Sequence, residues 1–534
     1  MHCTRPRSPQ VGGRATAIIA ALLAALASSS CFIVHRTRVA QLPRAPVQVG
    51  SPVRAHMIDG TTVVFRGGVQ VTADSVIARG VTGGAVFGLT LAATTAVRAV
   101  PLSGVLGLEV YQDEVDAAST FAISTLATVG VIAGAVAIAC AANPKCFGSC
   151  PTVYSDSSGQ AVLEAEGFSY SIAPLFEMRD VDALRVRPDS TGQVRLEVRN
   201  EALETHYINQ LELLEVVHAP DERIAPSPAG GAVAVRGLQV PAAAHDRAGR
   251  DLRATLAAHD GVVFATDPVT LRNATAADHD DWIDFELPAP ATDSAAVALR
   301  LRNSLLTTVL FYDVMLGDRG ANALNYVSDD LSRIGPAVDL GRWYAEHMGM
   351  HVSVWDHGAW RSAGRLLDTG PVAWKDAIVV IPVPRGEPVL RIRLSFVADD
   401  WRIDRVAVTG DWRRAAPRTI PVTRIVDSDG HDDSTAAASM RAADTRYLRT
   451  QPSQRFSVRF ETGPAPLDST RSFLLVSQGY YIEWIRQGWI TQARAGTPAS
   501  FEPGDAAIGE SLRRWREDRT GLERRFAATR VPVR

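Results

Sequence analysis

The feature that most constrains this chain is a run of 26 residues, 117–142, that contains no charged side chain. An α-helix needs roughly 20 apolar residues to cross a bilayer, so the run is long enough to span one. Gly130 and Gly134 lie within it at G-x-x-x-G spacing, a small-residue face that lets two membrane helices approach closely. The run therefore predicts a transmembrane helix, with these two glycines as candidate helix–helix contacts in a homodimer. The alternative is a small-residue helix buried inside a soluble domain.

Residues 1–38 have the order of an export signal: basic residues, then ATAIIAALLAALA, then small residues that end at Cys31. Bacterial lipoproteins carry their lipidated cysteine at such a place, although their motif usually has Leu where this chain has Ser28. Cys31 is our lipidation candidate. A plain signal cleaved after Ala27 and an uncleaved anchor are the alternatives. We expect a membrane-anchored protein of the bacterial cell envelope, in the outer membrane or facing the periplasm.

Two cysteines follow the apolar run and bear on which side of the membrane the rest of the chain occupies. If the leader exports residue 31 onward and the run spans once, the large C-terminal part would return to the cytoplasm. Cys146 and Cys150 are close enough to form a disulfide, which persists in an oxidising compartment, and they favour the envelope. Metal binding by this pair is less attractive because no second Cys or His pair follows at zinc-site spacing. We expect no cofactor.

Alternation with a period of two residues dominates the remainder. Val194, Leu196 and Val198 alternate with polar residues, and the pattern recurs at 297–301, 390–396 and 456–460. This predicts a mainly β protein of half-buried antiparallel sheets. The expected division is a leader at 1–38, a small SH3-like β-barrel at 46–112, the apolar helix at 117–142, a β-rich domain at 143–290, a β-sandwich-like domain at 291–415 with a helical insert at 321–348, and β plus a C-terminal amphipathic helix at 416–534.

Two segments of this region resemble each other. Residues 195–205, RLEVRNEALET, align with residues 298–308, ALRLRNSLLTT, at a spacing of about one sandwich domain. The similarity predicts a duplicated β-sandwich, with chance as the alternative at this length. Near the C-terminus an apolar stripe on an Arg-rich helix includes Trp515, and we expect this helix to dock on the last sheet rather than on a membrane surface.

Charge and motif content exclude several functional classes. The formal net charge is −3, from 55 basic and 58 acidic residues, so there is no broad positive field for a nucleic-acid partner. The sequence has no G-x-S-x-G elbow, H-E-x-x-H motif, P-loop or G-x-G-x-x-G after a strand. Carboxylates such as Glu164, Glu166 and Asp180 cannot be ranked as catalytic candidates until their positions in the structure are known. We assign no catalytic residue and expect no turnover.

An aromatic cluster in GYYIEWIRQGWI is the candidate ligand platform, because flat rings stack on a sugar or hold a protein partner. Its members are Tyr480, Tyr481, Trp484 and Trp489. The alternative is core packing, since aromatic residues dominate β cores.

Asp427, Asp429 and Asp432 resemble the start of a calcium loop and are the candidate metal ligands. The ending differs from an EF-hand, since Ala438 stands where the bidentate Glu belongs. The alternative is an exposed acidic loop.

Residues 143–184, beginning NPKCFGSCPTVY, resemble an uncharacterised family of predicted bacterial lipoproteins that place an SCP-type Cys motif after an apolar helix. Segments 301–317 and 479–490 are similar to the continuation of that family. The resemblance implies a location and no activity.

Together these patterns predict a membrane-anchored envelope protein with a binding or scaffolding role, whose partners are membrane lipid and an envelope protein or a glycan. The alternative is an envelope hydrolase that acts on a polymer through a site between the β-sheets and the 321–348 helices. A deep cleft with converging carboxylates would favour the enzyme, and filled sheets with a flat aromatic patch would favour binding.

Overall fold

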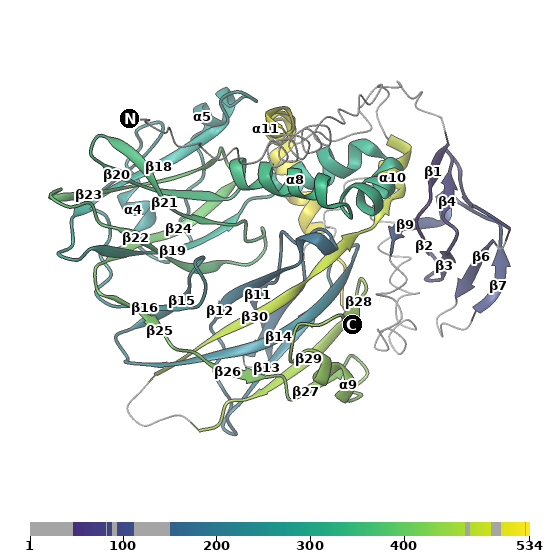
Figure 1. The fold of residues 1–534 in the computed structure, drawn as a ribbon, viewed down its shortest axis with the longest axis horizontal. Helices are drawn as coiled ribbons and strands as arrows, with labels where there is room; N and C mark the ends of the chain where they lie inside the picture. Colours follow the sequence, from purple (N-terminus) through teal and green to yellow (C-terminus); the bar gives the residue numbers. More distant parts are fainter. Residues whose placement is uncertain are drawn as a thin grey trace, which may run out of the picture. The chain divides into compact units, whose positions relative to one another are not determined.

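The computed structural model describes residues 46–81, 83–87, 93–111, 150–157, 159–464, 470–492, 504–528 and 530–533. Over these residues the chain is mainly β, with several antiparallel sheets and few helices (Figure 1). The expected fold class is confirmed at this level. The cause is visible in Val297, Leu299 and Leu301, which are almost fully buried, because alternate side chains of a strand point to the same face.

The N-terminal strands form two sheets, and the expectation of a closed SH3-like barrel at 46–112 is wrong. Within the described residues no strand pairing joins the two sheets. A strand bonds two neighbours at most, and β9 is already flanked by β2 and by β31 from the distant C-terminal part. The four-stranded sheet has the order β1 (Val47–Val49), β4 (Val69–Val71), β5 (Ser75–Ala78), β8 (Ala99–Pro101). The six-stranded sheet has the order β31 (Ile485–Arg486), β9 (Val105–Val110), β2 (Val53–Met57), β3 (Thr62–Phe65), β6 (Gly84–Phe87), β7 (Ala93–Val97).

A buried ionic cluster attaches these sheets to the next part of the chain. Glu109 on β9 is bonded by His56 at 2.8 Å and by the hydroxyl of Tyr207 at 3.1 Å. Burial raises the pKa of Glu109, but the charge of Arg54 and the bond from His56 outweigh it and lower that pKa to about 2. The His56 ring also stacks on Trp484 at 3.6 Å between centroids.

Two larger sheets share the main hydrophobic core with the N-terminal strands. The first has the order β11 (Gln160–Glu166), β10 (Thr152–Ser157), β13 (Gln193–Arg199), β29 (Arg455–Glu461), β27 (Arg424–Asp427). The second has the order β12 (Met178–Leu184), β30 (Thr470–Glu483), β14 (Glu204–His218), β26 (Arg418–Pro421), with β28 (Leu448–Thr450) also paired to β14. Strands of the last part of the chain thus pair with strands some 250 residues earlier, as between Val198 and Phe456.

A separate core lies between two further sheets. One has the order β22 (Lys375–Pro382), β19 (Ser294–Asn303), β24 (Trp401–Thr409). The other has the order β17 (Ala243–Asp246), β18 (Asp280–Pro288), β23 (Val389–Val397), β20 (Met350–Asp356), β21 (Ala359–Leu366). A small sheet has the order β15 (Arg223–Pro226), β16 (Ala232–Val235), β25 (Trp412–Ala415). Alternate side chains of β18, β20 and β23 point into this core, so the other face of their sheet points away from it.

The longest described helices are α8 and α11, and their ends lie beside each other (Figure 1). Pro336 lies in the first turn of α8, where its missing N–H leaves no bond unmade. The helices within the described residues are η1 (Leu102–Gly104), η4 (Pro174–Phe176), α4 (Arg253–Leu256), α5 (Pro268–Asn273), α6 (Leu306–Thr308), η5 (Val309–Leu316), η6 (Gly317–Arg319), α7 (Asn322–Asn325), η7 (Tyr326–Asp330), α8 (Ile334–His347), α9 (Ser434–Ser439), α10 (Gln487–Gln492) and α11 (Asp505–Ala528).

The apolar stripe of α11 is buried as expected, but it packs mainly against η5, with α5 and α6 beside it, rather than on the last sheet. Trp515 is fully buried and donates from Nε1 to Asp399 Oδ2 at 2.7 Å. Arg514 donates to Asp318. Buried polar partners of this kind fix the angle and register at which the helix docks.

The two similar segments occupy matching places in different sheets. β13 lies between β10 and β29, and β19 lies between β22 and β24. An Arg-Asn pair stands at the end of each strand, with Asn200 directly after β13 and Asn303 as the last residue of β19. The side-chain amides of both asparagines bind groups distant in the sequence. This common placement is what a duplicated unit would produce, and duplication stays a prediction.

The predicted membrane helix at 117–142 and the leader at 1–38 lie outside the described residues. Among the helices that are described, none has both the length and the apolar character needed to cross a membrane.

Candidate functional site

Four residues singled out from the sequence, Cys31, Gly130, Gly134 and Cys146, lie outside the described residues. Cys150 is a buried free thiol in this structure. Burial, together with nearby carboxylates, raises the pKa of this thiol well above its ordinary value. The Cys146–Cys150 disulfide therefore stays a prediction.

The four rings of the predicted ligand platform are all buried. Tyr480, Tyr481 and Trp484 are 2 to 3% exposed, and Trp489 is 5% exposed. Trp484 donates to Thr205 Oγ1 at 2.9 Å and stacks on His56, so its ring joins the β9 sheet to β14. These rings present no face to solvent here, and they occupy the core positions that the alternative interpretation expected.

The acidic loop after β27 brings together Asp427, Asp429 and His431, whose ligand atoms lie within 4.8 Å of one another. Asp432, the third residue expected there, is instead paired with Arg424 at 2.7 Å. The carboxylate of Asp427 accepts from the main-chain N–H groups of Asp429 and His431. These are the bonds of an Asp-stabilised turn.

A pair of buried acids meets where β19 ends. Asn303 donates from Nδ2 to Asp368 Oδ1 at 2.8 Å and to Asp400 Oδ2 at 3.2 Å. Tyr344 on α8 bonds the same Asp368, and Thr307 bonds Asp400. Burial raises the pKa of both aspartates, that of Asp400 well above its ordinary value.

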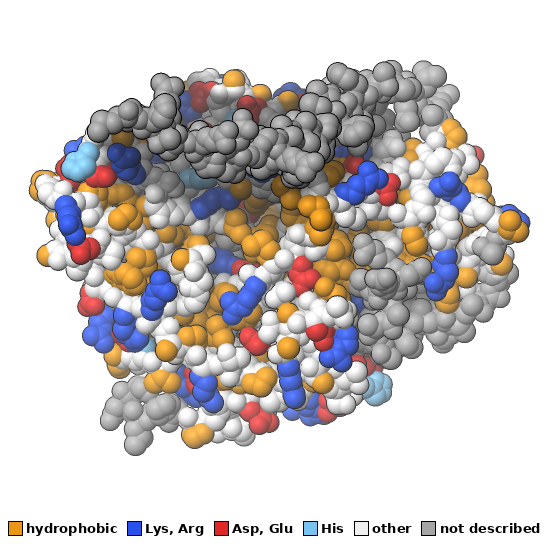
Figure 2. Space-filling model, in the orientation of Figure 1, with side chains coloured by type: hydrophobic (Ala, Val, Ile, Leu, Met, Phe, Trp, Pro, Cys, Tyr) orange, Lys and Arg blue, Asp and Glu red, His pale blue; other side chains and the backbone are white. Residues whose placement is uncertain are grey.

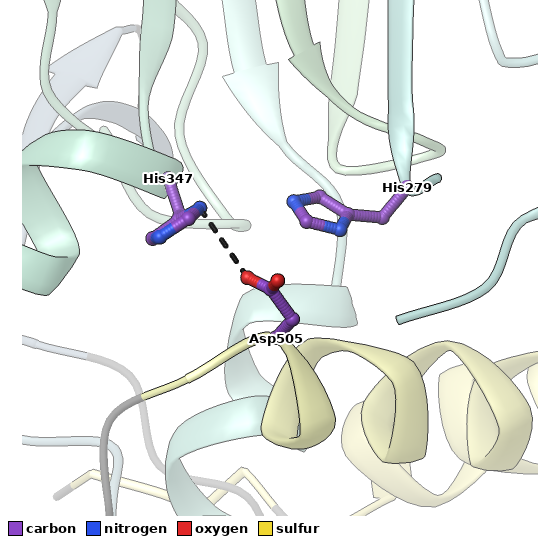
Figure 3. Close-up of side chains that lie close together, drawn as sticks. All are labelled: His279, His347 and Asp505. Atoms are coloured by element: carbon purple, nitrogen blue, oxygen red, sulfur yellow. Dashed lines mark ion pairs between the residues drawn. The ribbon is translucent and has the colours of Figure 1, made fainter. Parts of the chain in front are cut away.

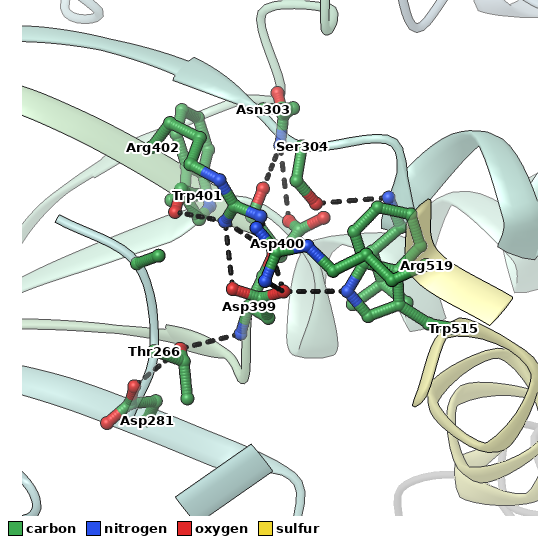
Figure 4. Close-up of polar contacts among 12 residues, drawn as sticks. Thr266, Asp281, Asn303, Ser304, Asp399, Asp400, Trp401, Arg402, Trp515 and Arg519 are labelled. Atoms are coloured by element: carbon green, nitrogen blue, oxygen red, sulfur yellow. Dashed lines mark hydrogen bonds and ion pairs between the residues drawn. The ribbon is translucent and has the colours of Figure 1, made fainter. Parts of the chain in front are cut away.

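Asp399, which directly precedes Asp400 in the same turn, has a different set of partners (Figure 4). Asp399 has a φ of 62° and is fully buried. Its carboxylate accepts from Arg402 at 2.9 Å and from Trp515 at 2.7 Å, and Arg519 lies 3.2 Å away. Thr266 in turn bonds the main-chain N–H of Asp399 at 2.7 Å. The turn between β23 and β24 is thus the point where helix α11 is attached to the sheets.

A small cavity of about 40 Å³ lies beside the acid pair, lined among others by Cys150, Glu166 and Tyr344. Glu166 Oε2 accepts from Val372 N at 2.8 Å and Ala373 N at 3.1 Å, while Oε1 has no hydrogen-bond partner among the described residues. Burial raises the pKa of Glu166, those two backbone bonds lower it, and the net value is about 7. A cavity of this size accommodates one or two water molecules, whereas ligand pockets measure about 300–1,000 Å³.

The other two carboxylates named from the sequence have separate partners. Glu164 accepts from Ser155 Oγ at 2.6 Å and from the N–H of Arg185. Asp180 is paired with Lys375, which also lies 3.0 Å from Asp182. Both therefore serve as local ion-pair or hydrogen-bond partners.

The outward face of the β18–β23–β20–β21 sheet carries a row of stacked side chains that the sequence did not single out as a unit. We call Arg247, Trp282, Arg393, Trp355 and Trp360 the Arg–Trp face. The guanidinium of Arg393 lies 4.7 Å from the ring centroid of Trp282 and 4.5 Å from that of Trp360. Arg247 lies 4.8 Å from Trp282, and Trp355 meets Trp360 edge-on at 5.3 Å. All five are half-buried.

Carboxylates hold both arginines of this face in place. Arg393 donates from two nitrogens to Asp284, each at 2.7 Å, and Arg247 makes the same two-bonded contact with Asp278 at 2.8 and 2.9 Å. Such paired bonds restrict the guanidinium to one plane, so the face is ordered in advance of any contact. The alternation at 390–396 predicted the outward direction of Arg393, but only strand pairing brings Trp282 and Trp360 to its two sides.

No family model and no curated protein matches this chain. Among solved structures it is similar to the C-terminal CBM6 of LamC, a marine laminarinase from Zobellia galactanivorans, with 11% identity over 37% of this chain and 98% of that one and a TM-score of 0.13. A GH31 alpha-xylosidase from Xanthomonas citri has 10% identity over 83% of this chain and 38% of that one, with a TM-score of 0.15. A structure of infectious bursal disease virus, Gx strain, has 9% identity over 71% and 82%, with a TM-score of 0.11. At these TM-scores the matches carry no argument about function.

Proposed function

We propose that this chain is an exported, membrane-tethered protein of the bacterial envelope that binds a partner protein through the Arg–Trp face. The observation that carries the proposal is the position of Arg393, which stacks between Trp282 and Trp360 while Asp284 holds its guanidinium. Tryptophan and arginine are the residues most enriched among those that dominate binding energy at protein interfaces.

The state of the face before binding supports a protein partner. Its side chains are half-buried and already ordered, so little rotamer entropy remains to be lost on association. Its arginines are paired with carboxylates, so the face has no excess of one charge that would select an anionic polymer. Acidic and basic side chains are likewise interspersed over the molecular face drawn in Figure 2. A surface on which acidic and basic side chains are paired in this way suits a protein partner.

Site-specific crosslinking in intact bacteria tests the proposal. A photoreactive amino acid is placed at Ser362, an exposed position on β21 two residues from Trp360. We expect a discrete crosslinked product that disappears when Trp360→Ala is added. The matched control is Trp412→Ala, which removes another half-buried tryptophan from a different sheet and should leave the product intact. A product that survives Trp360→Ala, or no product at all, would contradict a binding role for this face.

Two further parts of the proposal rest on the sequence. The tether requires either lipidation of Cys31 or insertion of residues 117–142 into the membrane. Metabolic labelling with a fatty-acid analogue distinguishes the two. If Cys31 is lipidated, wild type carries the label and Cys31→Ser does not. Retention in the membrane fraction without label indicates that the apolar run is the tether.

For homodimerisation, crosslinking of wild type is compared with crosslinking of a Gly130→Leu, Gly134→Leu variant. An unchanged dimer yield would reject the helix–helix contact.

An envelope hydrolase is the second candidate, and the observation in its favour is the convergence of Asp368, Asp400 and Glu166 beside Tyr344 of α8. Their raised pKa values are of the kind found in general acids. The adjoining cavity of about 40 Å³ is far smaller than a sugar unit requires, so catalysis would need this region to open. Release of reducing ends from envelope polymers by wild type, and its loss in Asp400→Asn, would support this candidate over the binding role.

A further inference from the structure

Three potential metal ligands from distant parts of the chain meet at one edge of the β18–β23–β20–β21 sheet. His279 directly precedes β18, His347 is the last residue of α8, and Asp505 is the first residue of α11. One ligand atom from each lies within 4.8 Å of the others. Figure 3 shows the two imidazole rings and the carboxylate directed toward a common space between the three elements.

The orientation of His279 is already that of a metal ligand. The residue is 9% exposed, and Nδ1 lies 3.0 Å from the main-chain oxygen of Ala276. A carbonyl oxygen only accepts, so Nδ1 must carry the hydrogen, and the lone pair of the neutral ring is then on Nε2. Histidine ligands in metalloproteins are typically held by this kind of second bond, which fixes both the tautomer and the plane of the ring.

Separate contacts hold the helices that supply the other two ligands. The end of α8 is fixed by Arg365, which donates to the carbonyls of Tyr344 and Met348 at 2.8 and 2.7 Å. These anchors keep His347 in position, with its ring 5.8 Å from that of His279.

The start of α11 approaches the loop that carries His279 so closely that a Cβ added at Gly509 would lie 2.8 Å from the Cβ of Ala276. Arg516 on the same helix donates to the carbonyls of Leu271 and Ala274. Asp505 is therefore held against the loop by contacts further along α11.

We propose that His279, His347 and Asp505 bind a divalent transition-metal ion of the Zn²⁺ class. Two imidazole nitrogens and one carboxylate oxygen form a donor set that suits zinc and its neighbours. In a tetrahedral site with metal–ligand bonds of about 2.1 Å, ligand atoms lie about 3.5 Å apart. His347 Nδ1 and Asp505 Oδ1 are already 3.8 Å apart, and all three ligand atoms lie within 4.8 Å of one another, so binding needs side-chain rotations that draw them together.

The fourth coordination position faces the solvent side of the site. The side chain of Asp505 is 53% exposed, whereas that of His347 is 23% exposed. A water molecule completes the tetrahedron there, as in zinc sites with three protein ligands. The ion links α8, α11 and the loop that leads into β18, which places it at the border of the Arg–Trp face, since Trp282 lies three residues after His279.

Zinc titration of the full-length chain, in competition with a chromophoric chelator, tests the site. We expect wild type to bind one equivalent of Zn²⁺ more than His347→Ala, and Asp505→Asn to weaken that equivalent by about tenfold or more. Because Asp505 is exposed, its amide variant should fold normally, and circular dichroism of the metal-free proteins checks this. Substitution with Co²⁺ should give the intense visible absorption of a tetrahedral ion in wild type and not in His347→Ala.

The matched control is His431→Ala, which alters the other described group of potential ligands. It should retain the equivalent that His347→Ala loses. Equal zinc stoichiometry in wild type and His347→Ala, or a loss caused by His431→Ala instead, would overturn the proposal.

Discussion

Replacing Glu166 with Gln should make the stability of the protein less dependent on pH. The pKa of Glu166 is raised from an ordinary 4.5 to about 7, mainly by burial. Each pKa unit corresponds to about 1.4 kcal/mol, so the ionised carboxylate costs the folded state about 3 kcal/mol. The side chain is 1% exposed, so screening by solvent is small.

The sign follows from comparing the folded and unfolded chains. Below the ordinary pKa of 4.5, Glu166 is protonated in both states and its contribution to stability is complete. As the pH rises, the unfolded chain loses the proton first while the folded chain keeps it, so the stability falls until the folded carboxyl ionises near pH 7. Glutamine cannot ionise, and its side-chain oxygen can accept the same two backbone bonds from Val372 and Ala373.

Urea unfolding of wild type and Glu166→Gln at about pH 5 and about pH 8 measures this effect. The stability of the variant relative to wild type should rise by about 2 to 3 kcal/mol between the two conditions. Glutamine places an amide group where the carboxylate has Oε1. The free-energy cost of this replacement is the same at both pH values, so it cancels when the two conditions are compared. Glu286→Gln, on the exposed outer face of β18, is the control and should show no comparable change. A difference between Glu166→Gln and wild type that stays constant with pH would refute the reasoning.

Three further substitutions test how the parts of the fold are joined. Lys375→Met leaves the two buried aspartates that Lys375 bridges without a counter-charge. Denaturant unfolding should show that the free energy of unfolding falls by about 3–5 kcal/mol, and a variant with near wild-type stability would refute the bridge. Gly107→Ala places a Cβ about 2.7 Å from the Cβ of Trp484 and should cost about 1–3 kcal/mol, whereas Gly335→Ala, with open space around it, should not. Trp515→Phe removes the hydrogen bond to the buried carboxylate of Asp399 and should lower the free energy of unfolding by about 1–3 kcal/mol. The variant should also be cleaved faster by a protease near α11.

Some of the candidate sites could be predicted in part. Alternation placed Arg391 and Arg393 on an outward face, and both lie there, because the direction of a side chain in a strand depends only on its parity. The same reasoning could not place Trp360 beside Arg393, since their strands are separated in the sequence and joined through β20. The aromatic cluster near residue 480 was visible in the sequence, but its burial depended on which sheets covered it.

The sequence by itself determined the class of fold, because the two-residue period of apolar side chains is a local property that each strand carries alone. Local spacing also indicated the amphipathic character of α11 and helices within 321–348, although the helical segment begins earlier, at Leu306. Only the tertiary structure decided which strands pair, that β31 occupies the edge of β9, and that His279, His347 and Asp505 share one site. These outcomes depend on contacts between residues far apart in the chain, whose energies arise from the whole packed core.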